Sequence, residues 1–269
     1  MTRNNYSIEH QSFIKRKKKT SLFVFISQLA LLVLIILLWE VLAQLNVLNT
    51  IFTSSPSRIA NAIYNLMLEG NLFYHIGITL SEAVIGFILA SFLGYVFALL
   101  LWSNAYLRRI LEPYIVVLNS LPKIALGPLI IIWFGVGIKS IIVMDFLILI
   151  IVTTLSLLSS FLNVDKEKVF LLQSFKASKL QLLTKLVIPS TIKDFISVLK
   201  INVGLTWVGT IMGEYLVSKA GLGYLIVYGG AVFKLDLVMA STIILCLLAT
   251  LMYLIVLSIE YFYNKKHQK

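Results

Sequence analysis

The sequence predicts an all-α membrane protein with about six transmembrane helices and a helical hairpin outside the bilayer. The first observation behind this prediction is composition: of 269 residues, 59% are hydrophobic and 13% are charged. The second is a mean hydropathy of +0.94. A soluble domain usually carries about 25% charged residues, so this chain lacks the polar groups to coat a globule. The composition therefore excludes a water-soluble enzyme, a disordered tail and a collagen-like fibre.

The third observation is a series of apolar stretches that reach the length of a membrane-spanning helix, about 20 residues. We expect spans near residues 21–45, 78–102, 113–134, 141–162, 195–217 and 237–263. The third is interrupted at Leu121-Pro122-Lys123, and the fifth is the least apolar. The first is longer than a signal-peptide core of roughly 7–15 residues and lacks a small-x-small cleavage site, so we interpret it as a retained helix.

The distribution of Lys and Arg predicts the orientation. With a cytoplasmic N-terminus, the segments inside the cell carry eighteen of these residues and the segments outside carry four. This bias predicts an even number of spans with both termini in the cytoplasm of a multi-pass cell-membrane protein. The predicted organisation is a cytoplasmic tail at 1–20, a membrane domain at 21–263 and a second cytoplasmic tail at 264–269. The same bias accounts for the net charge of +11 without nucleic acid.

Two connections between the spans are longer than turns. The first contains an amphipathic stretch at residues 59–68, with Ser55 as the expected N-cap and Pro56 at the first helical position. The second, at residues 163–194, is basic and lies on the predicted cytoplasmic side. We expect two helices there, the second ending at Pro189, and exposed Leu and Phe side chains suited to docking on another protein. An amphipathic hairpin resting on anionic lipid is the alternative.

Small residues form one face of the second span. Gly86, Ala90, Gly94 and Ala98 recur at intervals of four, and Gly209 and Gly213 repeat the spacing in the fifth span. Such faces let helices approach closely in membranes. The pattern predicts a compact bundle.

Polar residues within the spans are candidates for a translocation path, because ionisable groups are expensive in a bilayer. Asp145 is the deepest, and Glu82 and Glu214 lie nearer the ends of their helices. Structural pairing and a role in the path remain open for these acids. The candidate path residues are Asn119, Ser120, Trp133, Asp145, Thr206, Trp207 and Glu214.

No pattern indicates catalysis, a metal site or a cofactor. The stretch from Gly135 to Ser140 resembles a phosphate-binding loop, but Ile138 occupies the place where that loop needs glycine before the lysine. A single cysteine, Cys246, cannot form an internal disulfide, and no Cys/His cluster is present. We expect no catalytic residue, no metal ligand and no cofactor in this chain.

The connection at 163–194 resembles the cytoplasmic loop of the membrane permease subunits of bacterial ABC importers. That loop carries Glu-Ala-Ala, three residues, Gly, nine residues, Ile, one residue, Leu and Pro. Pro189 matches the final proline, Ile188 and Leu186 are conservative replacements, and Lys176 falls at the glycine. The Glu-Ala-Ala positions are Phe170, Leu171 and Leu172, so the spacing is kept and these residues differ.

The resemblance extends over residues 54–262. Its motifs are similar to the branch that handles nitrate, sulfonates and taurine: Ser55-Pro56-Ser57-Arg58, Leu121-Pro122-Lys123-Ile124-Ala125-Leu126-Gly127-Pro128, Trp133-Phe134-Gly135-Val136-Gly137 and Gly213-Glu214-Tyr215-Leu216. Related branches for thiamine precursors and riboflavin have similar permeases.

The resemblance implies a type I importer permease that forms a homodimer and docks two ATP-binding cassette subunits through this loop. It also implies an extracytoplasmic substrate-binding protein and a partner subunit that holds ATP and Mg²⁺. The expected contacts with the ATPase are Phe175, Lys176, Ala177, Ser178 and Lys179, with Pro189 at the end of the loop. An ion-coupled secondary transporter using Asp145 or Glu214 is the main alternative, and a membrane-embedded enzyme is a weaker one.

Overall fold

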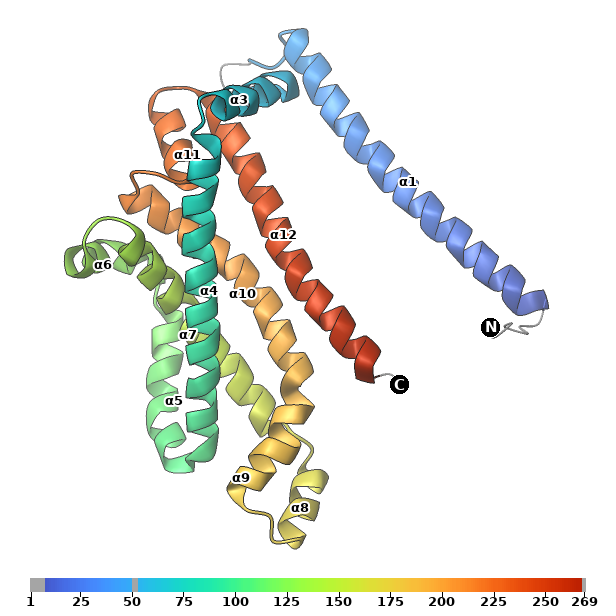
Figure 1. Cartoon of the computed structure of the whole chain (residues 1–269), viewed down its shortest axis with the longest axis vertical. Coiled ribbons are helices and arrows are strands. Elements are labelled where there is room, and N and C mark those ends of the chain that lie inside the picture. Colours follow the sequence, from blue (N-terminus) through green and yellow to red (C-terminus); the bar gives the residue numbers. More distant parts are fainter. Residues whose placement is uncertain (1–7, 50–52, 268–269) are drawn as a thin grey trace. The chain divides into compact units, whose positions relative to one another are not determined.

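The computed structural model of the chain describes residues 8–49 and 53–267, and every regular element in these two ranges is helical. The chain divides into two compact units between Ala62 and Ile63. The first contains α1 (Ile8–Gln44) and the start of α3 (Pro56–Leu68), and the second contains the remainder of α3 and every later helix (Figure 1).

In the first unit, α1 begins well before the expected span, because the basic run at residues 15–19 continues the helix. The start of α3 confirms the predicted cap: the Ser55 hydroxyl accepts a hydrogen bond from the Arg58 N–H at 3.4 Å. Glu40 of α1 also caps the start of α3. Its carboxylate accepts hydrogen bonds from the Ser57 N–H at 3.0 Å and from the Ser57 hydroxyl at 2.8 Å. The free N–H groups of the first turn of α3 are therefore satisfied by side chains.

The second unit is a helical bundle around three long helices, α4 (Leu72–Ser103), α7 (Ile138–Leu162) and α10 (Ile188–Val217). These three make the most extensive contacts, with α7 packed against both of the others. The other elements are α5 (Ala105–Ser120), η1 (Lys123–Leu126), α6 (Gly127–Phe134), α8 (Lys166–Ser174), α9 (Lys179–Leu182), η2 (Leu183–Val187), α11 (Leu222–Ala231) and α12 (Leu235–His267). The hairpin of α8 and α9 projects at the end of the bundle opposite α11 (Figure 1).

Five helices of the described residues are long and apolar enough to cross a membrane, and a bent pair brings the number to six. The pair consists of α5 and the segment η1–α6, which meet at an angle of 88°. Pro122 lies at this break, as expected from the interruption at Leu121-Pro122-Lys123. The helix before the break begins earlier than expected, at Ala105, because the Asn104 side chain caps it by accepting from two backbone N–H groups at 3.0 Å.

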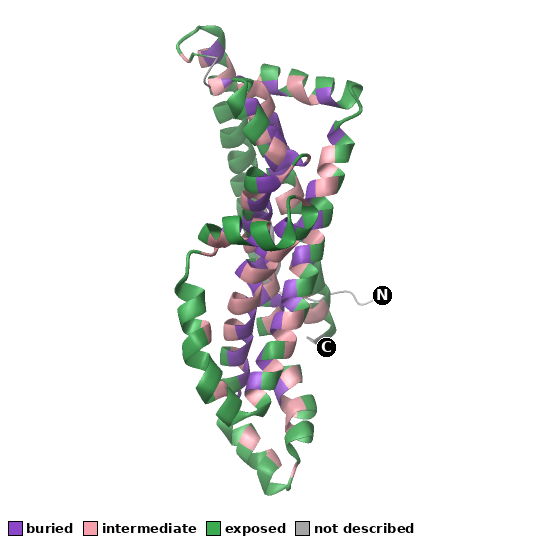
Figure 2. Cartoon of the chain, turned by 90° about the vertical axis from the view of Figure 1, so that its left-hand side faces the viewer, coloured by how far each residue is buried: buried purple, intermediate pink, exposed green. Residues whose placement is uncertain are grey.

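The small residues of α4 lie where it crosses α7, and the predicted close approach is confirmed. A Cβ atom placed on Gly86 would lie 2.6 Å from the Asp145 Cβ, and one on Gly94 would lie 2.6 Å from the Thr153 Cβ. Gly213 also brings α10 close to α7, since a Cβ atom placed on it would lie 3.0 Å from the Ile141 Cγ2. The buried residues of the second unit gather on these facing sides, while the outer faces are exposed (Figure 2).

The expectation that Pro189 ends the second hairpin helix is wrong. The chain continues from α9 through the π-helical turn η2 into α10, and Pro189 lies in the first turn of α10. A proline is tolerated there because the wider turn removes the need for its missing N–H. The hydroxyls of Ser190 and Thr191 donate to the carbonyls of Leu186 and Val187 at 2.6 and 2.8 Å. The hairpin and α10 therefore form one helical path.

We predict that Gly86→Val disrupts the bundle, because its side chain would overlap Asp145 and force α4 away from α7. Overpacking of this kind costs about 1–3 kcal/mol. The measurement is the thermal stability of the detergent-solubilised chain, together with the monodisperse fraction in gel filtration. The matched control is Gly77→Val in the same helix, where a Cβ meets nothing within 4 Å. Equal stability of the two variants would contradict the packing described here.

Candidate functional site

The seven candidate path residues fall into two groups in the structure. Asn119, Ser120 and Trp133 are exposed on the bent pair α5 and α6. Asp145, Thr206, Trp207 and Glu214 are buried within the second unit. The two groups therefore lie in different environments, exposed and buried, and their role in a path stays a prediction.

A polar contact joins all three central helices at Asn202. The Asn202 amide donates to the Ser91 hydroxyl of α4 at 2.9 Å and to the Thr153 hydroxyl of α7 at 2.8 Å. Thr206, one turn further along α10, donates to the Asn202 carbonyl at 2.8 Å. Interhelical hydrogen bonds of this type stabilise helix association in membranes, so Asn202 acts in packing in this conformation. The Thr206 hydroxyl is satisfied within α10.

Glu214 lies at the other end of this junction and fixes the start of α11. Its carboxylate accepts from the Thr79 hydroxyl at 2.6 Å and from the Gly223 N–H. Thr79 in turn accepts from the Leu222 N–H at 2.8 Å, and His75 accepts from the Gly221 N–H at 2.9 Å. A helix N-terminus favours a nearby negative charge, because its first N–H groups are free. The segment Gly221-Leu222-Gly223 is thus bound to α4 and α10.

Asp145 and Glu82 complete a group of three buried carboxyls. Asp145 accepts from the Thr210 hydroxyl at 2.7 Å and lies against Gly86 and Gly209. Glu82, one turn from Gly86 on α4, is fully buried and neither of its carboxyl oxygens has a hydrogen-bond partner. The described residues contain no group of three or more Asp, Glu, His or Cys side chains that fits a metal ion.

The hairpin presents the expected contact residues at its tip. Phe175 is 76% exposed, and Lys176, Ser178 and Lys179 are exposed with it, whereas Ala177 is half-buried. Lys176 has a φ of 57°, the left-handed conformation that favours glycine. The Ala177 N–H donates to the Leu172 carbonyl at 3.0 Å, and this bond is typical of a helix end. In that arrangement, the position that Lys176 occupies here is usually glycine. The backbone at Lys176 therefore keeps the conformation that a glycine would adopt.

Ser178 starts the second hairpin helix through a capping box. Its hydroxyl accepts from the Gln181 N–H at 3.2 Å, and the Gln181 side chain accepts from the Ser178 N–H at 2.8 Å. These paired bonds fix the turn between α8 and α9. The tip is therefore a defined surface.

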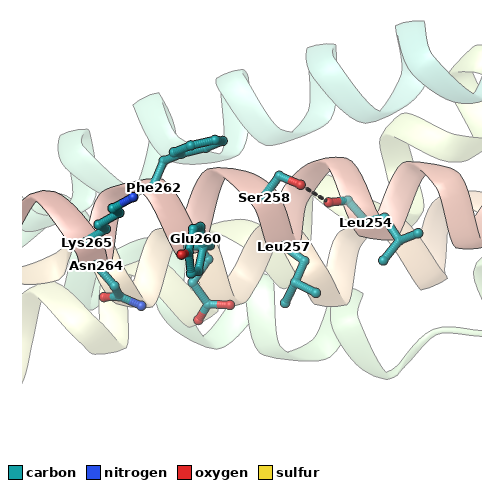
Figure 3. Close-up of a pocket in the computed structure, with 8 residues that line it drawn as sticks. Leu254, Leu257, Ser258, Glu260, Phe262, Asn264 and Lys265 are labelled. Carbon is teal, nitrogen blue, oxygen red and sulfur yellow. Dashed lines mark hydrogen bonds between the residues drawn. The ribbon is translucent and has the colours of Figure 1, made fainter.

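A groove runs along the last turns of α12 (Figure 3). Its lining side chains come from α12 alone: Leu254, Leu257, Ser258, Glu260, Tyr261, Phe262, Asn264 and Lys265. Glu260 is already paired with Lys200 of α10, at 2.9 Å. This groove contains none of the predicted site residues.

Sequence reasoning missed the role of Thr79 and His75 in holding the Gly221-Leu222-Gly223 segment. The available signal was the spacing of Thr79, Glu82 and Gly86, which places them on one face of α4. It showed a polar face and did not identify the partner segment 143 residues further along the chain.

We predict that Thr79→Val weakens the attachment of α11, because valine keeps the shape and removes the hydroxyl. One Glu214 oxygen and the Leu222 N–H then lose their partner, at a cost of about 1–3 kcal/mol for each buried group. Thermal unfolding of the purified chain is the measurement. Thr242→Val is the control, since that exposed hydroxyl bonds only the Val238 carbonyl of its own helix. A Thr79→Val protein as stable as the control would contradict this role.

Comparison with known proteins identifies the chain's relatives. The model of the family described as binding-protein-dependent transport system inner membrane component matches residues 90–268. A probable ABC transporter permease protein of Haemophilus influenzae is 30% identical over 81% of this chain and 89% of its own length. The taurine transport system permease protein TauC of Escherichia coli is 23% identical over 82% of each chain. The formylaminopyrimidine transport permease protein ThiX of Halalkalibacterium halodurans is 30% identical over 71% of this chain and 76% of that protein.

Solved structures show the same fold. The inward-facing MetNI methionine ABC transporter includes a chain with a TM-score of 0.60 at 17% identity, covering 70% of this chain and 95% of that one. An amino acid ABC transporter gives a TM-score of 0.59 at 14% identity, covering 76% of this chain and 97% of that one.

The family implies ATP-binding partner subunits and a substrate-binding protein. The five or six apolar helices make the chain a multi-pass membrane protein. The chain belongs to the binding-protein-dependent transport system inner membrane components and is a permease subunit of an ABC importer.

Proposed function

We propose that the tip of the α8–α9 hairpin is the docking surface through which a separate ATP-binding subunit drives this permease. The observation that carries the proposal is the exposed aromatic side chain of Phe175. The turn that follows it is fixed by the Ala177–Leu172 hydrogen bond at the end of α8 and by the Ser178–Gln181 capping box at the start of α9. An apolar side chain that projects into water on a rigid turn is suited to a partner's groove. The neighbouring Lys176 and Lys179 add positive charge to the same surface.

The continuity of α9, η2 and α10 supports a mechanical role for this surface. A displacement of the hairpin would be transmitted along α10 toward Glu214 and the start of α11, because no loop separates these elements. Rigid-body movement of helices around an interface is a common way to open one mouth of a path and close the other. In this scheme the chain carries no catalytic residue and no cofactor, and ATP and Mg²⁺ are held by the partner.

A second copy of the chain is the proposed neighbour of the bent pair α5 and α6. This face combines exposed apolar side chains such as Ile132 and Trp133 with a polar group at Lys123 and Asn119. The Lys123 ammonium donates to the Asn119 carbonyl and side-chain oxygen at 3.3 and 3.2 Å. Such polar groups at membrane depth are costly against lipid and favourable beside water or protein. We therefore place Asn119, Ser120 and Trp133 at the path between two copies.

The orientation that fits this scheme places both termini and the hairpin in the cytoplasm, as the distribution of Lys and Arg predicts. An extracytoplasmic binding protein would then deliver solute to the end of the bundle at α11. A cell-membrane location follows from the same arrangement.

The proposed substrate is a small solute of the nitrate, sulfonate and taurine type. A pyrimidine thiamine precursor is the second candidate, favoured by the 30% identity to the formylaminopyrimidine permease against 23% to the taurine permease. Selectivity of such systems would lie largely in the binding protein. The small molecule bound to the binding protein that co-purifies with this chain distinguishes the two candidates.

We predict that Phe175→Glu abolishes solute uptake and reduces co-purification of the ATP-binding subunit at least tenfold, because a charge replaces the apolar docking side chain. Amounts of the chain in the membrane should stay unchanged. The control for co-purification is Phe233→Glu, at an equally exposed phenylalanine (77%) in the connection between α11 and α12. Normal uptake and normal co-purification in the Phe175→Glu variant would overturn the docking role.

A further inference from the structure

The junction of α4, α7 and α10 holds an imbalance of charge. Glu82, Asp145 and Glu214 are each at most 1% exposed, and the buried residues of the described chain include no Lys, Arg or His. Burying ionised carboxylates without a positive partner is strongly unfavourable. The site therefore requires a positive charge that the side chains themselves do not supply.

The hydrogen bonds show which carboxyl lacks its partner. Glu214 accepts from Thr79 and Gly223, and Asp145 accepts from Thr210. Glu82 receives no hydrogen bond at either oxygen from the described residues. It lies three residues from Thr79 on the same face of α4, and the Thr79 hydroxyl binds the Glu214 carboxylate at 2.6 Å, so the two carboxyl groups face the same side of α4. An ionised carboxylate can only accept a hydrogen bond. A bond between these two groups therefore exists only if one of them carries a proton.

A metal ion fits the site less well than a proton. Hard cations take about six oxygen ligands, and the three acids do not form a metal-holding group. The helices are also too close to admit one beside Asp145, because even a methyl group on Gly86 would overlap that side chain. A proton needs no such space.

We propose that Glu82 is a buried proton-binding site, in which its carboxyl group holds a proton and donates it in a hydrogen bond to the Glu214 carboxylate. Glu214 is the acceptor because its oxygens already receive two other hydrogen bonds, which favour its charged form. The titratable groups around the pair are His75 on α4, Asp145 on α7, Tyr215 on α10 and Tyr224 on α11. Lys219, between α10 and α11, is exposed to solvent.

The bound proton would tie α4 to α10 at the end of the bundle where α11 begins. Glu214 already holds Gly223, and Thr79 holds Leu222, so the Glu82 proton closes a network that joins three segments. This end lies opposite the hairpin (Figure 1). The proposal does not depend on the docking of an ATP-binding subunit.

Infrared spectroscopy of the full chain in lipid nanodiscs tests the proposal at neutral pH. A protonated carboxyl shows a carbonyl stretching band that ionised carboxylates lack, and exposed Asp and Glu are ionised at this pH. Because the Asp145 Oδ1 atom also lacks a hydrogen-bond partner among the described residues, the comparison is made in the Asp145→Asn chain. We expect the band in that chain and its loss when Glu82→Gln is added, whose amide can still donate to Glu214. Glu69→Gln, at an exposed glutamate, should retain the band.

Three results would overturn the proposal: no band in the Asp145→Asn chain, a band that survives the addition of Glu82→Gln to it, or a band that appears only after sodium is removed from the buffer. The last result would indicate a metal cation in place of the proton. If the double variant does not fold, the Asp145→Asn chain labelled with ¹³C in its glutamate side chains keeps the test decisive. A proton on Glu82 predicts that the label shifts the band, and an unshifted band would assign it elsewhere.

Discussion

The close approach of α4, α7 and α10 is the constraint on which the rest of the structure depends. Lipid provides no hydrophobic force between helices, so their association relies on packing and on hydrogen bonds. Gly86 and Gly94 provide the packing by allowing α7 to lie against the backbone of α4. Asn202 provides hydrogen bonds to both neighbours. With larger residues at the glycines, neither the Asn202 contacts nor the burial of Asp145 would be attainable.

The same constraint connects the two ends of the molecule. Because α10 lies in this tight junction over most of its length, we expect it to move as part of a rigid body. One end continues through η2 into the hairpin, and the other holds the start of α11 through Glu214. In the proposed scheme, movement of an ATP-binding partner passes along α10, because this helix connects the hairpin with the start of α11.

The sequence allowed much of the fold to be predicted, because membrane spans, caps and small-residue faces depend on local composition. The break at Pro122, the cap at Ser55 and the face containing Gly86 were all confirmed. The helix end at Pro189 was predicted wrongly, because a proline that usually ends a helix is tolerated beside a π-helical turn. Local pattern also could not show that Thr79 and Glu214 meet, since that contact depends on how two distant helices cross.

The most direct test of the account is whether the hairpin and α10 move as one body. The exposed Cys246 is first replaced by serine, and spin labels are then placed at Lys179 and Ser218 in the assembled transporter. Pulsed electron spin resonance measures the distance between them with and without a non-hydrolysable ATP analogue. The account predicts that this distance stays constant, while the distance from Lys179 to a label at Arg108 on α5 changes. A change between Lys179 and Ser218 as large as that to Arg108 would contradict it, because the helix would then bend at η2 and transmit no movement.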